Sequence, residues 1–265
     1  MTRRRTPKWL QAARTSDAGF RSGEKPDWIA RALSRAGVLP PDQAAAAVRA
    51  GRVTVGGRVV REPLTMLRPG DEVWLDGRAV DLAAHTRVLL FHKPAGVVTS
   101  TVDPEGGGTV FARLSAALPP PLRGYGWHAV GRLDRNTTGL LLFTNDERFV
   151  AYATRPETHL PKRYVATVQG RADDVRLEPL RRGVVLDDGP TRPARAVVRA
   201  PDVVELTLTE GRNHQVKRML AAVGLPVRAL HREAVGDLVL DVAEGAVREL
   251  SAEEIRGRLG WPPGA

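Results

Sequence analysis

A polar, turn-rich segment followed at once by a block of apolar residues is the feature of this sequence that most constrains its fold. The segment reads GRLDRNTTGLLLFTND, residues 131–146, and its apolar block runs from Leu140 to Phe143. Four consecutive apolar residues bounded by turn-forming residues are typical of a fully buried strand. Asp134 therefore lies in a loop anchored directly in the core, and such scaffold-held loops commonly present functional groups.

Two interpretations of Asp134 are open from the residues alone. Arg132 and Asp134 are two positions apart, so in an extended segment their side chains point the same way. Asp134 could cap the turn and pair with Arg132 or Arg135, as turn aspartates commonly do. It could equally be a catalytic carboxylate, held at the edge of the core by the stiff turn that follows it.

A second segment, EGRNHQVKRMLAAVG, predicts a helix that carries cations close to the core. Asn213 is the predicted N-cap and Gly224 the predicted end. Lys217 and Arg218 flank an apolar stripe and are placed to hold an acid ionised, an effect of about 1.4 kcal/mol for each pKa unit. The stripe consists of Val216, Met219, Leu220 and Val223.

Two further polar residues have an ordinary and a functional interpretation. For His214, no second histidine or carboxylate stands at metal-ligand spacing, so we expect hydrogen bonding or packing and no metal site. Tyr164, in PKRYVATVQG, begins a predicted strand. It is by default a core residue, but a ring beside an acid could also stack on a nucleobase.

Charge and cysteine content narrow the classes of function. The formal net charge of +10 favours a polyanionic partner, most commonly nucleic acid, although a merely basic surface would give the same count. The absence of cysteine excludes disulfides, thiol nucleophiles and zinc base deaminases with cysteine ligands. No apolar run reaches membrane-spanning length and no secretory signal is visible, so we expect a cytoplasmic protein.

The chain divides into three parts by composition and periodicity. Residues 1–22 carry six Lys/Arg against one acid and predict a flexible basic arm. Residues 23–83 predict a small module of two helices, the second from Pro41 to Gly51, and two hairpins that turn at Gly56-Gly57 and Asp76-Gly77.

Residues 84–265 predict a larger α+β domain. Strand blocks such as VLLFHK, YVATVQG, RAVVRA and VVELTL alternate irregularly with helices near Arg113, Val175 and Gln215. This order favours a mixed, mainly antiparallel sheet flanked by helices over a doubly wound fold.

The small module resembles the S4 RNA-binding domain over roughly residues 24–82, through the pattern ARALSRAGVLPPDQAAAAVRAGRVTVGGRVV. The family usually begins its second helix with a Ser-Arg-Arg-like segment, where this chain has Pro40-Pro41-Asp42. The resemblance implies RNA binding, and the candidate contact residues are Arg31, Arg35, Arg49, Arg52 and Arg58.

The larger domain resembles the pseudouridine synthases, specifically the ribosomal branch that joins an S4 domain to the catalytic domain. The motifs HKPAGVV, GRLDRNTTGLLLFTND, PKRY, EGRNHQVKRM and LHREAVGDLVLD occur in the family's order. The resemblance implies isomerisation of uridine to pseudouridine in ribosomal RNA, without metal or cofactor. HAVGRLD, HQVKRM and LHRE lean toward the small-subunit branch, and a large-subunit target is the alternative.

The resemblance also implies a role for each matching residue. Asp134 is the expected catalytic aspartate and Lys217 its basic partner. Tyr164 is expected to stack on the uracil and Leu230 to line its pocket. Arg132 is expected to help open the RNA, and Arg218 is a further candidate for substrate binding.

Two other classes of function compete with this interpretation. A non-catalytic S4-type protein bound to ribosomal RNA explains the charge and the small module. A carboxylate-based hydrolase would need a second acid near Asp134, for which Glu210 and Asp146 are the candidates. For a pseudouridine synthase we expect a monomer whose partner is ribosomal RNA or a ribosomal assembly intermediate, with no membrane and no metal.

Overall fold

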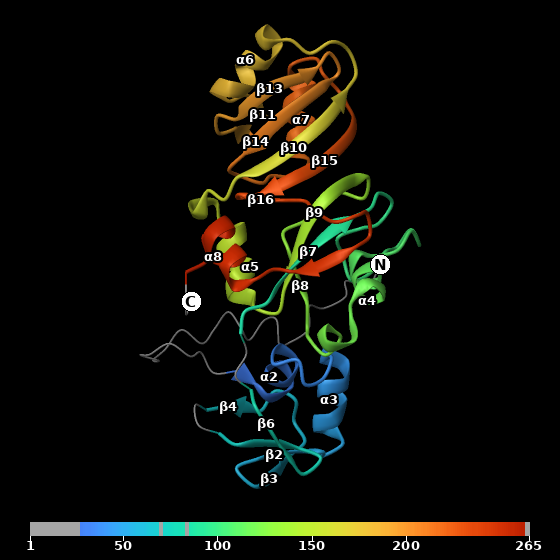
Figure 1. The fold of residues 1–265 in the computed structure, drawn as a ribbon, viewed down its shortest axis with the longest axis vertical. Coiled ribbons are helices and arrows are strands. Elements are labelled where there is room, and N and C mark those ends of the chain that lie inside the picture. The colour runs from blue at the N-terminus through green and yellow to red at the C-terminus, as the bar shows by residue number, and fades with distance from the viewer. Residues whose placement is uncertain (1–26, 69–70, 83–84, 263–265) are drawn as a thin grey trace. The chain divides into compact units, whose positions relative to one another are not determined.

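The computed structural model describes residues 27–68, 71–82 and 85–262, which form two compact units (Figure 1). The N-terminal unit comprises the described residues up to His85 together with Pro120–Gly126, and the C-terminal unit comprises Thr86–Pro119 and the residues from Trp127 onward. The predicted basic arm, residues 1–22, lies outside the described residues. Residues 120–126 group with the N-terminal unit, although the sequence pattern places them in the larger domain.

The N-terminal unit contains two helices and a four-stranded antiparallel sheet. The strand order is β3-β2-β5-β6, and a short pair, β1 with β4, lies outside this sheet. The elements are α2 (Ile29–Arg35), α3 (Pro41–Arg49), β1 (Asp27–Trp28), β2 (Val53–Val55), β3 (Arg58–Val60), β4 (Met66–Leu67), β5 (Val73–Leu75) and β6 (Arg78–Val80).

Both predicted hairpins of this unit are confirmed. Gly56 and Gly57 join β2 to β3 with φ of 54° and 75°, and Asp76 and Gly77 join β5 to β6 with φ of 50° and 75°. Positive φ at both central residues is the signature of the two-residue turn that matches strand twist. The second helix begins at Pro41, as predicted, because proline suits the first helical position.

The segment Pro120–Gly126 packs closely on the end of α2. A methyl group on Gly124 would lie 2.3 Å from the carbonyl oxygen of Gly37, and the amide of Gly126 donates to the carbonyl of Ser34 at 3.2 Å. Only a residue without a side chain permits this approach of two backbones. The N-terminal unit is therefore completed by a segment far along the chain.

The C-terminal unit is built on a nine-stranded sheet in the order β13-β14-β10-β15-β9-β7-β17, with β8 added on β9 and β16 on β15. Its strand pairs are antiparallel except β15 with β9, which confirms the mixed, mainly antiparallel α+β prediction. The strands are β7 (Val88–Lys93), β8 (His128–Val130), β9 (Thr137–Thr144), β10 (Lys162–Val168), β13 (Arg195–Ala200), β14 (Val203–Leu208), β15 (Val227–Val235), β16 (Leu238–Val239) and β17 (Val247–Glu249). A separate hairpin pairs β11 (Val185–Leu186) with β12 (Gly189–Pro190).

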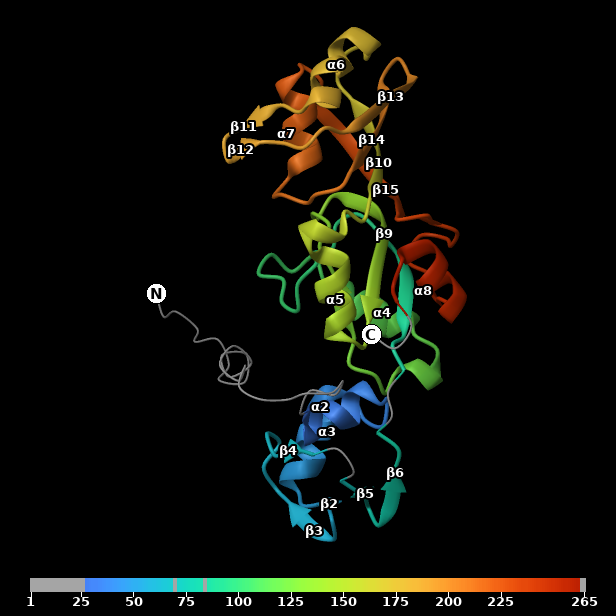
Figure 2. The same cartoon turned by 90° about the vertical axis from the view of Figure 1, so that its left-hand side faces the viewer.

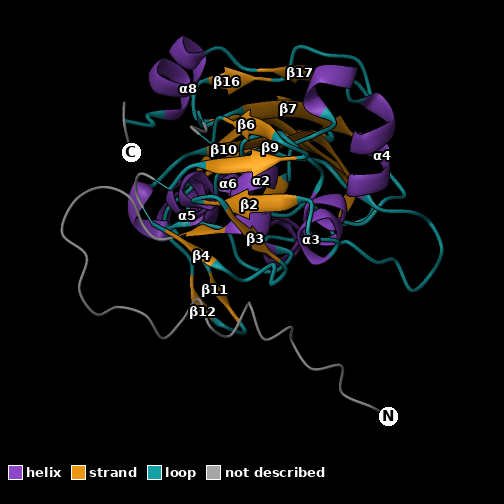
Figure 3. Ribbon diagram, turned by 90° about the horizontal axis from the view of Figure 1, so that it is seen from below, coloured by secondary structure: helices purple, strands orange, loops and turns teal. Residues whose placement is uncertain are grey.

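Helices cover both faces of this sheet (Figures 2 and 3). On β9, Leu140 and Leu142 pack in one core cluster with α5 (Glu147–Thr154) and α8 (Ala252–Leu259). On the other face, the ring of Phe143 meets that of Phe111 in α4 (Val110–Ala117) with centroids 5.6 Å apart. The helices α6 (Asp174–Arg182) and α7 (Gln215–Ala222) pack on β10, β13 and β14. None of the helices in the described ranges is long and apolar enough to cross a membrane.

The apolar block of the opening segment forms the centre of β9. Leu140, Leu141, Leu142 and Phe143 are each at most 1% exposed, so the prediction of a strand buried on both faces is confirmed. The strand begins at Thr137, three residues after Asp134. The loop that carries Asp134 is therefore continuous with the most buried strand of the unit.

Gly139 should be irreplaceable where β9 runs beside β15. Its φ is 109°, and a methyl group there would lie 2.3 Å from the carbonyl oxygen of Arg232. Gly139→Ala should lower the free energy of unfolding by more than the 1–3 kcal/mol, roughly, that an unfavourable φ costs alone. Gly245→Ala is the matched control, because Gly245 has φ of 79° and open space around it. Equal losses in a chemical denaturation series would contradict the clash.

Candidate active site

The carboxylate of Asp134 is held by two basic side chains from the start of α7. Lys217 donates from Nζ to Oδ2 at 2.8 Å, and Nε2 of His214 lies 3.3 Å from Oδ1. Among the described residues these are the ion-pair partners of Asp134. The alternative in which Asp134 pairs with Arg132 or Arg135 is therefore wrong.

The turn that begins α7 differs from the prediction. His214, not Asn213, is the N-cap, and it has the left-handed values φ 49° and ψ 28°. The backbone carbonyl of Asn213 accepts a hydrogen bond from the Arg218 guanidinium at 3.1 Å, while Gln215 bonds the amide of Arg212 through its side chain at 3.0 Å. Among the described residues, no side chain caps the first turn of α7, so the predicted N-cap at Asn213 is wrong. The predicted end at Gly224 is confirmed, since Gly224 with φ of 73° follows the last helical turn.

A pocket opens beside Asp134 between the strands and α7. Tyr164 on β10 and Leu230 on β15 supply an aromatic and an apolar wall, and Arg132 and Lys217 supply positive charge. The structure therefore brings five of the predicted site residues to one pocket. Its full lining is Arg132, Leu133, Asp134, Thr137, Tyr164, Leu208, Glu210, Gly211, Arg212, His214, Gln215, Val216, Lys217 and Leu230.

Arg218 lies apart from this lining. Its guanidinium donates to Asp188, in the turn between β11 and β12, at 2.5 Å and 3.2 Å. This contact lowers the pKa of Asp188 to about 2. Arg218 thus ties α7 to the β11–β12 hairpin, and Arg212 reaches the same carboxylate at 3.4 Å.

Lys93 fixes the loop that presents Asp134, a role that its motif HKPAGVV did not reveal. The side chain is fully buried, and Nζ donates to the carbonyl oxygens of Pro94, Arg135 and Thr137 at 2.9, 3.0 and 2.9 Å. Burial lowers the pKa of Lys93 to about 8. A buried ammonium group needs such partners, so its three acceptors hold the backbone on the C-terminal side of Asp134 in place.

The loop between β7 and α4 binds the same segment on both sides of Asp134. Thr99 accepts the amide hydrogen of Leu133 at 3.2 Å and donates to its carbonyl at 2.8 Å. Asp103 accepts two bonds from the Arg135 guanidinium, at 2.8 and 3.1 Å, and its side chain is only 3% exposed. The Arg135 guanidinium lowers the pKa of Asp103 to about 2. Neither residue has a sequence signal of its own, because the contacts join segments about 30 residues apart.

The two acids considered for a hydrolase are both engaged. Glu210 lines the pocket, but it accepts bonds from the Gln215 side chain and from the amide of Arg192. Asp146 is outside the pocket lining, caps α5 by accepting the amide of Arg148 at 2.9 Å, and accepts the Thr86 hydroxyl at 2.8 Å. Neither carboxylate is placed as a free acid beside Asp134. Within the described ranges, no group of three or more potential metal ligands occurs.

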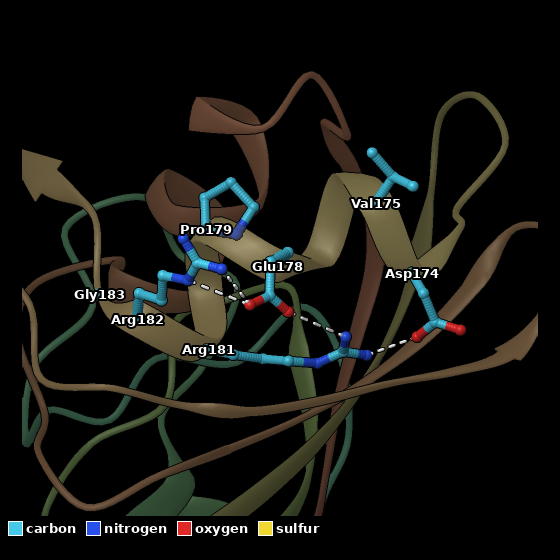
Figure 4. Close-up of a pocket in the computed structure, with 7 residues that line it drawn as sticks. All are labelled: Asp174, Val175, Glu178, Pro179, Arg181, Arg182 and Gly183. Atoms are coloured by element: carbon cyan, nitrogen blue, oxygen red, sulfur yellow. Dashed lines mark hydrogen bonds and ion pairs between the residues drawn. The ribbon is translucent and has the colours of Figure 1, made fainter.

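A second surface depression lies over α6 and offers no comparable chemistry (Figure 4). Arg181 pairs with Asp174 at 2.5 Å and with Glu178 at 3.4 Å, and Arg182 pairs with Glu178 at 2.9 Å. The two Glu178 pairs have the helical spacing that stabilises α6, and Asp174 adds a further pair with Arg181. The charged side chains of this depression are thus paired with one another.

The Asp103 contact should stabilise the fold in a pH-dependent way. Because the folded-state pKa of about 2 lies below the ordinary value of 3.8, the stabilisation is present above pH 3.8 and is lost as pH falls toward 2. Asp103→Asn should therefore lower the denaturation midpoint most at pH 7, with a smaller difference at pH 3. Glu105→Gln is the control, since Glu105 binds the same arginine at 3.0 Å but is 78% exposed. A pH-independent difference for Asp103→Asn would contradict this role.

Comparison with known proteins identifies the family. The family model for RNA pseudouridylate synthase matches residues 87–222, and the S4 domain model matches residues 28–73. The ribosomal small subunit pseudouridine synthase A of Yersinia pestis is 40% identical over 212 residues, which cover 78% of this chain and 88% of that protein. The ribosomal large subunit pseudouridine synthase B of Escherichia coli (strain K12) is 37% identical over 221 residues, which cover 80% of this chain and 74% of that protein.

A solved structure of a pseudouridylate synthase has a similar fold. A crystal structure of a pseudouridylate synthase superposes with a TM-score of 0.59 at 31% identity, covering 86% of this chain and 98% of that one. Both resemblances found in the sequence are thereby confirmed. The chain belongs to the RNA pseudouridylate synthase family and is a pseudouridine synthase that carries an S4 domain.

Proposed function

We propose that this protein isomerises uridine in ribosomal RNA, with Asp134 as the catalytic carboxylate. The observation that carries the proposal is the 2.8 Å contact between Lys217 and Asp134 inside the pocket that Tyr164 and Leu230 line. Relatives of similar identity are named for each ribosomal subunit, which supports ribosomal RNA as the substrate class.

The proposed reaction rearranges bonds within one nucleotide, and an ionised carboxylate can bring this about. The C1′–N1 bond of uridine breaks, the uracil rotates, and a new bond forms between C1′ and C5; the proton leaves C5 and N1 gains one. No electrons are exchanged and nothing is released. An ionised Asp134 can attack the sugar or the base, or can remove a proton, and in each case the Lys217 ammonium lies 2.8 Å from its Oδ2.

The remaining pocket residues suit a base taken out of its stack. An aromatic ring and an apolar wall can hold a flipped base between them, which is the role we assign to Tyr164 and Leu230. Arg132 lines the same pocket and is exposed. It can bind the RNA phosphates next to the flipped nucleotide. Arg218 pairs with Asp188, so we assign it no contact with the base.

The N-terminal unit is the proposed second contact with ribosomal RNA. Of its candidate arginines, Arg49 and Arg58 are exposed, whereas Arg52 pairs with Asp76 at 2.5 Å. Arg31 and Arg35 lie 3.5 and 3.0 Å from Asp27. The Arg52–Asp76 pair is exposed, and such pairs contribute only about 0–1 kcal/mol, so a phosphate group can take the place of the Asp76 carboxylate.

We propose a small-subunit target, with a large-subunit target as the alternative that the 37% identical relative favours. The test maps pseudouridine in both ribosomal RNAs from cells with and without the protein. A site lost from small-subunit RNA, and restored by the wild-type chain, is the expected result. If a pseudouridine were lost only from large-subunit RNA, the target would be large-subunit RNA instead. If the maps of both RNAs were unchanged, the proposed function would be refuted.

Asp134→Asn should abolish isomerisation and leave the fold intact. The amide keeps the size of the side chain but removes the charge, so the variant should retain its thermal stability and RNA affinity. Turnover should fall by at least ~10³-fold, because the group that reacts is absent. Asp202→Asn, at an exposed position, controls for the change in net charge. Near-wild-type turnover of a folded Asp134→Asn protein would remove Asp134 from the mechanism.

A further inference from the structure

His214 is a residue of the site whose conformation the fold alone does not explain. It is one of three residues other than glycine with positive φ in the described part of the chain, together with Asp76 and His159. Asp76 occupies a hairpin turn and His159 ends a short 3₁₀ helix, Pro156–Thr158. His214 instead begins α7 and directs its ring to the carboxylate of Asp134. Backbone strain retained at a site commonly accompanies a functional constraint.

The two contacts of Asp134 are unequal. Lys217 binds Oδ2 at 2.8 Å from within a helix whose neighbours Val216, Met219 and Leu220 are buried in the core. His214 lies farther from its oxygen, 3.3 Å from Oδ1, and its side chain is 55% exposed against 35% for Lys217. Oδ2 thus has the shorter contact, and Oδ1 has the longer contact, to the more exposed side chain of His214. The contact at Oδ1 is the weaker of the two and the easier one for a substrate to displace.

We propose that His214 competes with the substrate for Oδ1 of Asp134, and that it competes more strongly when its ring is protonated. The inference rests on the proposed role of Asp134. A charged imidazolium binds a carboxylate more strongly than a neutral ring does. Because Asp134 must meet the sugar or the base, an incoming uridine has to displace this contact. A comparison of variants at acidic and neutral pH therefore tests the competition, since histidine is the side chain that ordinarily changes charge between pH 5 and 8.

Other charged and titratable groups line the same pocket, and the test must leave them unaltered. They come from the Asp134 loop, from β10, from the segment before α7 and from α7 itself. These groups are Arg132, Asp134, Tyr164, Glu210, Arg212 and Lys217. Variants that alter His214 alone separate its effect from theirs.

Two substitutions at His214 isolate the contact. His214→Asn suits the left-handed conformation, which asparagine tolerates, but its shorter side chain withdraws from Oδ1. His214→Gln keeps an uncharged donor at longer reach. His159→Asn is the matched control, since His159 has the same φ of 50°, lies in the same unit and pairs with Arg192 outside the pocket lining.

The measurement is the steady-state rate of pseudouridine formation on a ribosomal RNA substrate from pH 5.5 to 8. At pH 5.5, His214→Asn should exceed the wild type in kcat/KM by about two- to fivefold, the range expected for an exposed ion pair. The gain should appear as a lower KM rather than a higher kcat, and it should fade by pH 8. His214→Gln should lose the same pH dependence, and His159→Asn should follow the wild type.

Two results would overturn the proposal. If kcat and kcat/KM of His214→Asn fell together at every pH, His214 would take part in the chemistry instead of competing with the substrate. If the pH profiles of variant and wild type were parallel, the contact would have no effect on capture.

A second measurement does not depend on turnover and so separates this inference from the proposed function. The ring resonances of His214, assigned by their loss in His214→Asn, should shift in Asp134→Asn while those of His159 should not. Unshifted His214 resonances would refute the contact itself. An inactive wild type with shifted resonances would instead refute the proposed function.

Discussion

The buried ammonium group of Lys93 is the interaction on which the geometry of the site depends. It donates to three backbone carbonyls, two of which, at Arg135 and Thr137, lie just after Asp134. Burying a cation is costly unless its hydrogen bonds are satisfied, so the loop is constrained to deliver those carbonyls. Thr137 then opens β9, whose parallel pairing with β15 sets Leu230 opposite Thr137. The wall of the pocket and the position of Asp134 thus follow from one buried charge and one strand pair.

The Lys217–Asp134 contact is a consequence of packing rather than its cause. The two residues are 83 positions apart, and each side chain is about one third exposed. A pair so exposed contributes only about 0–1 kcal/mol, which is too little to hold α7 in place. Burial of Met219 and Leu220 at 0% exposure holds the helix, since fully burying such side chains contributes about 1.5–3 kcal/mol each. Packing of the core therefore positions Lys217 beside Asp134.

Local chemistry was predictable from the sequence, and contacts between distant segments were not. The hairpin turns at Gly56 and Asp76, the strand at Leu140 and the end of α7 at Gly224 each have a short-range signal that the structure confirms. The predicted N-cap of α7 is wrong, because the chain enters the helix through the left-handed residue His214, one position after Asn213, and no side chain in the described ranges caps the first turn. The helix α8 was missed, although its capping box of Ser251 and Glu254 is visible in the sequence.

The braces at Thr99 and Asp103 show why the site itself was only partly predictable. Each joins the loop between β7 and α4 to the Asp134 loop, and neither loop has a periodic pattern from which its partner could be read. The family motifs placed Asp134, Tyr164, Lys217 and Leu230 in one site without saying what fixes them there. That information is in the fold, where the buried side chains of Lys93 and Thr99 bind the backbone on opposite sides of Asp134.

The net charge of +10 overstates the attraction that RNA meets at any one place. Many arginines of the C-terminal unit are engaged by carboxylates, as in the network of Arg199 with Glu205 and Glu233 at 2.5 and 2.9 Å. Where RNA binds such an arginine, a phosphate has to replace a carboxylate, and replacing one anion by another contributes little binding free energy. The favourable free energy then comes mainly from counterions released by the RNA, which is independent of sequence. Under the proposed function, selection of a uridine consequently falls to the pocket beside Asp134, where we propose that a flipped base is held between Tyr164 and Leu230.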